Sequence, residues 1–203
     1  MNVSALVLAA GISQRMPGSN KLLLPLRGKT IVAHTVDHLL AAEIAEVLVV
    51  VGHQAELVQG ALSGRAVNFV FNPDYAGGLS TAIVAGVRAA STAAQAFLIS
   101  LADVPLVTAA EVNLLLQSFT RRRDCSIAVP VHAGRRGHPV VFDRVHEREL
   151  LALTGDAGGR TILAAHSQAV LEVEMPVDHI LCDVDTPAAY ELVCLRWAEI
   201  GRG

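Results

Sequence analysis

The stretch VSALVLAAG at residues 3–11 decides the fold class. Residues 3–9 form a continuous apolar run that stops at small residues and Gly11. A strand that is buried on both faces of a parallel sheet has this pattern. Ligands of open α/β sheets bind beyond the carboxyl ends of such strands. The stretch therefore predicts a buried parallel strand that leads into a binding loop.

Strand-like and helix-like segments alternate outward from this stretch. Further strands are predicted at residues 47–51, 67–71, 96–101 and 126–131. Helices are predicted at residues 30–42 with Thr30 as N-cap, 54–62, 79–90 and 108–119. Such alternation is typical of parallel strands joined by helical crossovers on both faces of the sheet. We therefore predict an α/β fold with a mostly parallel sheet and helices on both faces.

The alternation loosens after residue 131. We predict short strands at 139–142, 170–174 and 180–184, helices at 144–153 and 187–199, and loops at 133–138 and 155–159. The chain of 203 residues contains no evident repeat, low-complexity tract or linker. A chain of this length suits one domain, so we predict a single domain with an elaborated C-terminal third.

The composition excludes several classes of protein. Hydrophobic residues make up 52% and charged residues 17%, which excludes intrinsic disorder. Aromatic residues are only 4% and the net charge is −3, so we expect no nucleic-acid partner. No apolar run approaches the roughly 20 residues of a membrane helix, so we expect no membrane partner. Cys125, Cys182 and Cys194 form no CxxC, which favours reduced thiols and a cytoplasmic location.

The loop after the first strand is a candidate phosphate site. Residues 8–16 contain Gly11 and other small residues as well as Arg15, and Lys21 follows five residues later. Backbone N–H groups of such a loop can approach phosphate oxygens, and the two cations can neutralise a triphosphate. Neither a P-loop nor a GxGxxG fingerprint is present. The alternative interpretation is a tight connection with solvated charges.

Three carboxylates follow predicted strands. Asp103 comes directly after residues 96–101, and Asp183 and Asp185 lie two apart, so they share a face if the strand persists. Mg²⁺ prefers one or two carboxylates plus substrate phosphates. The alternatives are that Asp103 is a turn residue, and that Asp185 or Thr186 caps the last helix.

Three glycine-rich loops complete the candidate site. Residues 72–81 lead into a helix with two glycines and two hydroxyl groups, and could hold a base or a phosphate. Residues 135–139 and 155–160 carry arginine, histidine and glycine, which suits a second, anionic substrate. Ordinary turns and surface loops are the alternative. His34 and His38 lie four apart on a helix, but without an evident third ligand packing is favoured over metal binding.

These segments together resemble a known family. In this order, LAAGISQRM (8–16), NKLLLPLRGKTIV (20–32), NPDYAGGLSTAI (72–83), LADVP (101–105), GHPVVF (137–142), GDAGGR (155–160) and DVDTP (183–187) are similar to segments of MobA-like nucleotidyltransferases, and most similar to the molybdenum cofactor cytidylyltransferases. The resemblance covers about residues 3–195. It implies a Rossmann-like, three-layer nucleotide-diphosphosugar transferase fold, with a nucleotide-binding part at about 1–125 and an acceptor-binding part at about 126–203.

The resemblance also implies a reaction and its residues. CMP would pass from CTP to the terminal phosphate of molybdopterin with Mg²⁺ as cofactor, which is EC 2.7.7 chemistry; a client molybdoenzyme is a further possible partner. The implied nucleotide-binding residues are Leu8, Ala9, Ala10, Gly11, Arg15, Lys21, Gly78 and Ser80. The implied acceptor-binding residues are Gly137, His138, Pro139, Gly155, Asp156, Gly158 and Arg160. Catalytic roles would fall to Arg15, Lys21 and Asp103, and metal binding to Asp103 and Asp185.

Some alternatives stay open. Ala10 resembles the cytidylyl branch, whereas relatives that use GTP tend to have glycine there; Pro17 departs from the glycine usual after Arg-Met. The same fold could serve GTP or another phosphate acceptor. A non-catalytic accessory protein that binds the cofactor is an alternative of another class. A redox enzyme with a bound dinucleotide is disfavoured because GxGxxG is absent.

Overall fold

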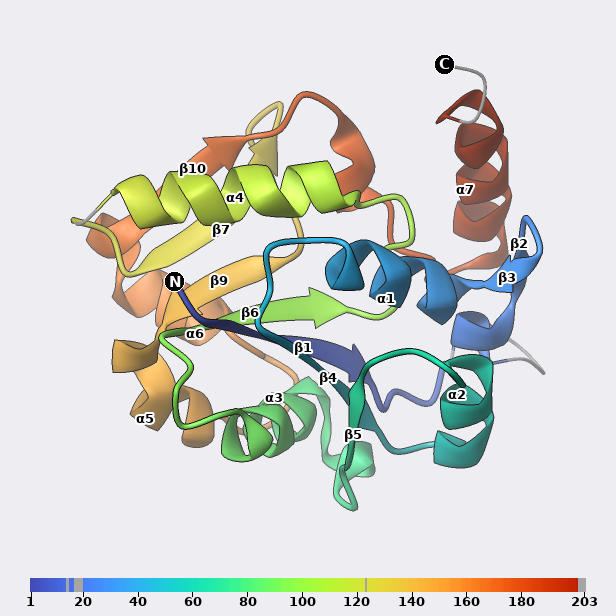
Figure 1. The fold of residues 1–203 in the computed structure, drawn as a ribbon, viewed down its shortest axis with the longest axis horizontal. Coiled ribbons are helices and arrows are strands. Elements are labelled where there is room, and N and C mark those ends of the chain that lie inside the picture. The colour runs from blue at the N-terminus through green and yellow to red at the C-terminus, as the bar shows by residue number, and fades with distance from the viewer. Residues whose placement is uncertain (14, 17–19, 123, 201–203) are drawn as a thin grey trace.

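One sheet organises the molecule. A computed structural model describes residues 1–13, 15, 16, 20–122 and 124–200, without the side chains of 198–200; Pro17 lies outside these residues. Within this part of the chain the sheet has eight strands, in the order β10-β7-β9-β6-β1-β4-β5 with β8 paired to β7 (Figure 1). The parallel strands of the first half are β1 (Val3–Ala9), β4 (Glu46–Val51), β5 (Asn68–Phe71) and β6 (Ala96–Leu101). Strand β1 lies between β4 and β6 and is buried throughout, as its apolar run predicts.

The C-terminal strands extend the same sheet with mixed direction. They are β7 (Ile127–His132), β8 (Arg135–Arg136), β9 (Val140–Asp143) and β10 (Val170–Glu174). Strand β9 pairs antiparallel with both β6 and β7, whereas β10 runs parallel to β7. The first and second halves of the chain therefore share one sheet, in which β9 lies between β6 and β7.

Helices cover both faces of the sheet (Figure 1). They are α1 (Ile31–Leu40), α2 (Ala55–Ala61), α3 (Leu79–Ala89), α4 (Ala109–Arg121), α5 (Glu147–Leu151), α6 (Arg160–Ala165) and α7 (Pro187–Ile200). Ala5 and Val7 of β1 belong to one apolar cluster with residues of α1, α2 and α4. Leu6 and Leu8 belong to a second cluster with residues of α3, α5 and α6. Because alternate side chains of a strand point to opposite faces, these clusters give the expected three layers.

Short elements fill the connections. These are the hairpin of β2 (Pro25–Leu26) and β3 (Lys29–Thr30), and the 3-10 turns η1 (Lys21–Leu23), η2 (Tyr75–Gly77), η3 (Arg144–His146), η4 (Ser167–Ala169) and η5 (Asp178–Leu181). Thr30 occupies the N-cap position of α1, but its side chain makes no capping bond. Of the described helices, none has the length and apolarity needed to cross a membrane.

Three predicted elements need correction. The strand at 180–184 is wrong, because η5 and irregular backbone occupy this segment. Ile180, Cys182 and Val184 do alternate into the core, but the backbone makes isolated bonds, such as Val184 N to the carbonyl of Asp103 at 2.9 Å. Alternating burial thus does not require a strand ladder. The segment 133–138, predicted as a loop, contains β8, and the segment 144–153, predicted as one helix, forms η3 followed by α5. Helix α6 was not predicted, because it has only six residues.

Candidate active site

Lys21 lies at the centre of the candidate site. Its ammonium group contacts Asp103 Oδ2 and lies 2.5 Å from Asp185 Oδ1. Arg15 Nη2 lies 2.5 Å from the other oxygen of Asp185. The three segments that carry these residues meet at the carboxyl ends of β1 and β6, where the open sheet predicts a ligand site. The structure therefore brings together all four charged residues that the sequence selected for this end of the site.

Asp183 joins this group of carboxylates. One oxygen each from Asp103, Asp183 and Asp185 lie within 4.8 Å of one another. The bond from Val184 N to the carbonyl of Asp103 holds the two segments side by side. The two aspartates of the 183–185 segment thus meet Asp103 although no strand carries them.

The electrostatics of the group follow from burial. Asp103 is 4% exposed, and burial raises the pKa of its carboxyl above the ordinary value despite the nearby Lys21. Burial and the charge of Asp103 also raise the pKa of Asp183. Burial acts in the same direction on Asp185, but the hydrogen bond and charge of Lys21, the hydrogen bond with Asp183 and the charge of Arg15 together outweigh it, and the pKa of Asp185 is lowered. Several ionised carboxylates at this distance require a cation between them, and here the Lys21 ammonium supplies that charge.

The same donor set suits a divalent cation. Carboxylate oxygens are the ligands that hard cations such as Mg²⁺ prefer. Asp103, Asp183 and Asp185 converge on one small volume that already attracts a positive charge. The residues present therefore fit a divalent metal ion.

A first cavity opens beside these charges. Its volume is about 410 Å³, and its lining includes the predicted nucleotide-binding residues Leu8, Ala10, Gly11, Arg15, Lys21 and Gly78. Asp103 and Asp185 also line it. Tyr75, which the sequence analysis did not select, forms part of its wall. Gly52 leaves room for that ring, because a Cβ there would lie 2.5 Å from the Cβ of Tyr75.

A second cavity adjoins the first. Its volume is also about 410 Å³, and its lining includes the predicted acceptor-binding residues Gly137, His138, Gly158 and Arg160. Leu8, Leu79 and Leu101 line both cavities and form the boundary between them. Most of the nucleotide and acceptor residues predicted from the sequence thus line one or the other of two neighbouring cavities.

His138 gives the second cavity an unusual polar group. Its Nδ1 atom is buried and has no hydrogen-bond partner within the described residues. Burial lowers the pKa of this imidazole, so the neutral form is favoured. The neighbouring Gly137 packs against the backbone of Ile180, and a Cβ at position 137 would lie only 2.3 Å from the carbonyl oxygen of Ile180. A ligand atom in this cavity could satisfy the His138 nitrogen.

Five of the residues predicted from the sequence do not line the cavity expected for them. Ala9, Ser80, Pro139 and Gly155 line neither cavity, and Asp156 lines the first rather than the second. Ala9 packs in the apolar cluster under α1 and α2. Ser80 is fully buried and donates its hydroxyl to Thr154 O at 3.1 Å, while its amide donates to Gly155 O at 3.1 Å. These contacts shape the site through the backbone.

Gly78 and Asp156 lock two loops together. Gly78 has φ +98° and ψ 179°, a conformation open essentially to glycine alone. A Cβ there would lie 2.2 Å from Asp156 Oδ1, the oxygen that accepts from Leu79 N at 3.2 Å. Asp156 thus caps α3 from a distant loop, which no local motif could have indicated.

The histidines of α1 serve packing. The ring nitrogen Nε2 of His34 lies 2.6 Å from the carbonyl oxygen of Leu26. The same ring packs against Trp197 with centroids 4.1 Å apart. His34 is therefore occupied by contacts within the fold, as the sequence analysis favoured.

Comparisons with known proteins agree with this architecture. The chain is 31% identical over 189 residues to the nicotine blue oxidoreductase of Paenarthrobacter nicotinovorans, with 91% of this chain and 92% of that protein covered. It is 27% identical over 199 residues to the molybdenum cofactor cytidylyltransferase of Escherichia coli K12, with 98% of both covered. A nucleotidyl transferase from Methanothermobacter superposes with a TM-score of 0.84 at 27% identity, covering 98% of this chain and 99% of that one.

The named relatives differ in their reactions, so similarity to one of them does not decide the chemistry of this chain. The family is nevertheless clear. A model described as the MobA-like NTP transferase domain matches residues 5–170, which include most of β1, Asp103 and the loops of the second cavity. This match confirms the resemblance found in the seven sequence segments, and the chain belongs to the family of MobA-like NTP transferase domains.

Proposed function

We propose that the chain transfers CMP from CTP to the terminal phosphate of a molybdopterin-type acceptor, with Mg²⁺ as cofactor. Pyrophosphate leaves, and the product is the molybdopterin cytosine dinucleotide. One observation carries the proposal: two cavities of about 410 Å³ each adjoin beside a group of carboxylates. A transfer between two bound phosphates requires two such neighbouring spaces.

The first cavity would take the nucleotide. The loop at Ala10 and Gly11 offers backbone groups to the cytidine end, and Arg15 and Lys21 stand at the phosphate end. Both cations are now paired with carboxylates. Asp103 and Asp185, with Asp183 beside them, would hold Mg²⁺, which neutralises charge on phosphate oxygens when bound. Lys21 and Arg15 would be the cations that face the phosphates.

The second cavity would take the acceptor. Its walls are apolar at Val140, Phe142 and Leu163, which suits a flat heterocycle such as a pterin. His138 Nδ1 supplies a polar contact that otherwise lacks a partner, and Arg160 supplies positive charge for the acceptor phosphate. The two parts of the chain at about 1–125 and 126–203 would thus bind one substrate each.

The bond changes are simple. An oxygen of the acceptor phosphate attacks the α-phosphorus of CTP and forms a P–O bond. The bond from that phosphorus to the bridging oxygen breaks, and pyrophosphate leaves with the electron pair. The attacking oxygen is already anionic, so no side chain has to remove a proton. Catalysis then rests on positioning and on the charges of Arg15 and Lys21.

A redox reaction is the second candidate. The oxidoreductase of Paenarthrobacter is similar over nearly its whole length, and the apolar second cavity would also suit a flat redox substrate. The cluster of Asp103, Asp183 and Asp185 favours the transferase, because this cluster suits a divalent cation beside a triphosphate and hydride transfer does not require one. Transfer from GTP, another phosphate acceptor, and a non-catalytic role in handing the cofactor to a client molybdoenzyme are further alternatives.

Calorimetric titration tests these candidates. The protein is titrated with CTP, GTP, ATP and NADPH, each with and without Mg²⁺, and pyrophosphate release is then measured with CTP and molybdopterin. Mg²⁺-dependent binding that favours CTP, followed by pyrophosphate release, supports the proposal. Preference for GTP moves the chain to the guanylyl branch. Binding of NADPH without any response to CTP overturns the proposal in favour of the redox candidate.

A further inference from the structure

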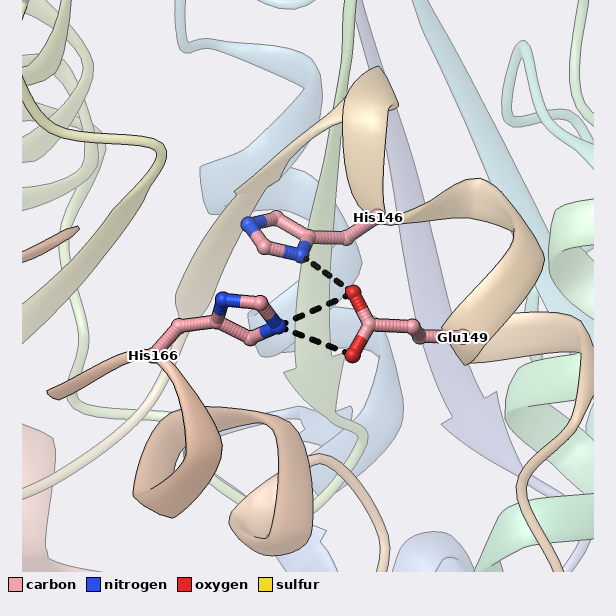
Figure 2. Close-up of side chains that lie close together, drawn as sticks. All are labelled: His146, Glu149 and His166. Carbon is pink, nitrogen blue, oxygen red and sulfur yellow. Dashed lines mark hydrogen bonds and ion pairs between the residues drawn. The ribbon is translucent and has the colours of Figure 1, made fainter.

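Besides the aspartates of the candidate active site, the structure contains a second cluster of side chains that can bind a metal ion. His146 ends η3, Glu149 lies in α5, and His166 directly follows α6. Figure 2 shows the two rings and the carboxylate pointing toward one another. His146 Nδ1 lies 3.0 Å from Glu149 Oε1, and His166 Nε2 lies 2.9 Å from Glu149 Oε2. The contiguous η3 and α5 thus provide two of the donors, and the end of α6 brings His166 to them.

The donor set is that of a transition-metal site. Two imidazole nitrogens and one carboxylate are ligands that Zn²⁺ takes in proteins. The ligand atoms of a tetrahedral zinc site lie about 3.3 Å apart, which follows from metal–ligand distances of about 2.0–2.1 Å. The donor atoms here all lie within 4.8 Å of one another. The two contacts to Glu149, at 3.0 and 2.9 Å, are already close to this spacing, and the two ring nitrogens would have to approach each other by at most about 1.5 Å to accommodate the ion.

A further contact orients the buried ring. Ser126 Oγ lies 2.8 Å from His146 Nε2, the nitrogen that faces away from Glu149. The backbone of Ser126 is itself fixed, because its amide donates to Ala169 O at 3.0 Å and its carbonyl accepts from Asp143 N at 2.8 Å. A metal-binding histidine typically uses its other nitrogen in this way. The Ser126 contact leaves Nδ1 as the ligand atom.

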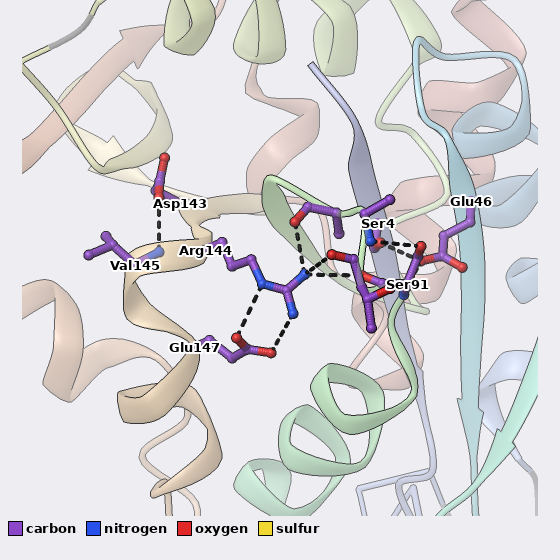
Figure 3. A network of polar contacts seen from close by, with 10 residues as sticks. Ser4, Glu46, Ser91, Asp143, Arg144, Val145 and Glu147 are labelled. Atoms are coloured by element: carbon purple, nitrogen blue, oxygen red, sulfur yellow. Dashed lines mark hydrogen bonds and ion pairs between the residues drawn. The ribbon is translucent and has the colours of Figure 1, made fainter.

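The segment that carries two of the donors is held without any ion. The Arg144 guanidinium donates to the backbone carbonyls of Ser91 and Thr92 at 3.1 Å and of Ala94 at 2.9 Å (Figure 3). The same group pairs with Glu147 at 2.9 Å. These bonds anchor η3 and the start of α5 to the loop between α3 and β6. His146 and Glu149 are therefore in place before a ligand arrives, which lowers the cost of binding.

We propose that His146, Glu149 and His166 bind a divalent transition-metal ion of the Zn²⁺ class. The ion would replace the contacts from the two rings to Glu149, and each ring would carry its proton on the other nitrogen. His146 would then donate from Nε2 to Ser126 Oγ. Water would complete the coordination, since Glu149 and His166 are partly exposed.

The site would act on the second cavity through α6. Helix α6 begins at Arg160 and lines that cavity with Leu163 and Ala164, while its far end leads directly into His166. A bound ion would clamp this end to α5. The ion is thus a positioning element for the cavity wall and takes no part in the bond changes described above. This inference does not depend on the identity of the substrates.

Zinc titration of the full chain tests the inference. Millimolar Mg²⁺ is present to occupy the carboxylates of the active site. We expect one tightly bound Zn²⁺ per chain, and a visible absorption spectrum of a low-coordinate site when Co²⁺ replaces it. His166→Ala and Glu149→Gln are expected to abolish both signals. Ser126→Ala removes only the orienting contact and is expected to weaken Zn²⁺ binding about 10–100-fold.

His132→Ala is the matched control. His132 also lies near a glutamate, with Nδ1 3.9 Å from Glu174, but has no third ligand among the described residues. This variant should bind Zn²⁺ as the wild type does. Zinc-induced shifts of histidine ring signals in NMR spectra of the wild-type protein provide a readout that needs no variant. Absence of Zn²⁺ binding under Mg²⁺, equal binding by His166→Ala, or shifts confined to other histidines would overturn the inference.

Discussion

Replacing Lys21 with methionine removes the cation that neutralises the carboxylates of Asp103 and Asp185. The Lys21 side chain is 18% exposed and that of Asp103 is 6% exposed, so this is a largely buried pair. Breaking a buried pair by removing one partner costs roughly 3–5 kcal/mol of unfolding free energy. Because the first cavity admits water to the group, we expect the low end of this range, about 3 kcal/mol, for Lys21→Met without metal.

Magnesium should reverse most of this loss. In the variant, the carboxylates of Asp103 and Asp185 are free to bind a divalent cation without competition from an ammonium group. Binding to the native state alone at a concentration of 100 times Kd stabilises a protein by about 2.7 kcal/mol. The unfolding free energy of Lys21→Met should therefore depend more steeply on Mg²⁺ than that of the wild type.

The loss should also shrink as the pH falls. Burial already raises the pKa of Asp103, and the charge of Lys21 partly lowers it again. Removal of Lys21 raises this pKa further. A buried acid with a raised pKa destabilises the fold while it is ionised, so protonation at lower pH relieves the cost. The difference between wild type and variant is thus larger at neutral than at mildly acidic pH.

Urea unfolding followed by circular dichroism measures these effects, with EDTA or with millimolar Mg²⁺ at both pH values. Lys29→Met is the matched control, because Lys29 is 52% exposed and pairs with Asp37 on the surface. Its removal should cost no more than about 1 kcal/mol and should not respond to Mg²⁺. Equal stability of Lys21→Met and wild type in EDTA would refute the reasoning, as would an equal response of both variants to Mg²⁺.

Three further predictions concern single positions. Asp103→Asn should lower the rate of pyrophosphate release about 10²–10³-fold while the far-UV circular dichroism is unchanged; turnover near the wild-type rate would remove Asp103 from the chemistry. Gly78→Ala should lower the unfolding free energy by about 2–4 kcal/mol in urea, from backbone strain and the lost loop contact, whereas Gly60→Ala within α2 should raise it by about 0.5–1 kcal/mol. Burial raises the pKa of Asp37, yet hydrogen bonds from Arg65 and Lys29 hold it at about 2. Asp37→Asn should therefore lower the unfolding free energy by about 1 kcal/mol at neutral pH. That difference should fade as the pH drops from about 4 toward 2; a pH-independent difference contradicts the ion-pair explanation.

Local patterns in the sequence were sufficient for most of the elements. The bounds predicted for β1 and β6 agree with the structure, and those of α1, α3 and β4 differ by only one or two residues. The strands are marked by continuous apolar runs and the helices by apolar residues at helical spacing. Both patterns involve residues that are close together in the sequence. The ordered motifs also indicated the family, which the match over residues 5–170 confirms.

Long-range pairing was decided only in the folded chain. The antiparallel position of β9 between β6 and β7 depends on which strands meet, and no local pattern encodes that choice. The segment at 180–184 shows the same limit, since its alternating burial is real but its backbone partners are isolated. Strand pairing requires a neighbour with free backbone groups, and a sequence pattern does not contain that neighbour.

The sites show the same division. The sequence by itself selected Arg15, Lys21 and the carboxylates, because charge and position after a strand are local properties. Only the tertiary structure decided that Lys21 neutralises those carboxylates, and that a loop aspartate caps α3. It alone brought His166 to the pair formed by His146 and Glu149, since a loop and α6 separate His166 from that pair along the chain. Residue identity supplies the chemistry of each group, whereas the distances between groups arise from packing of the whole chain.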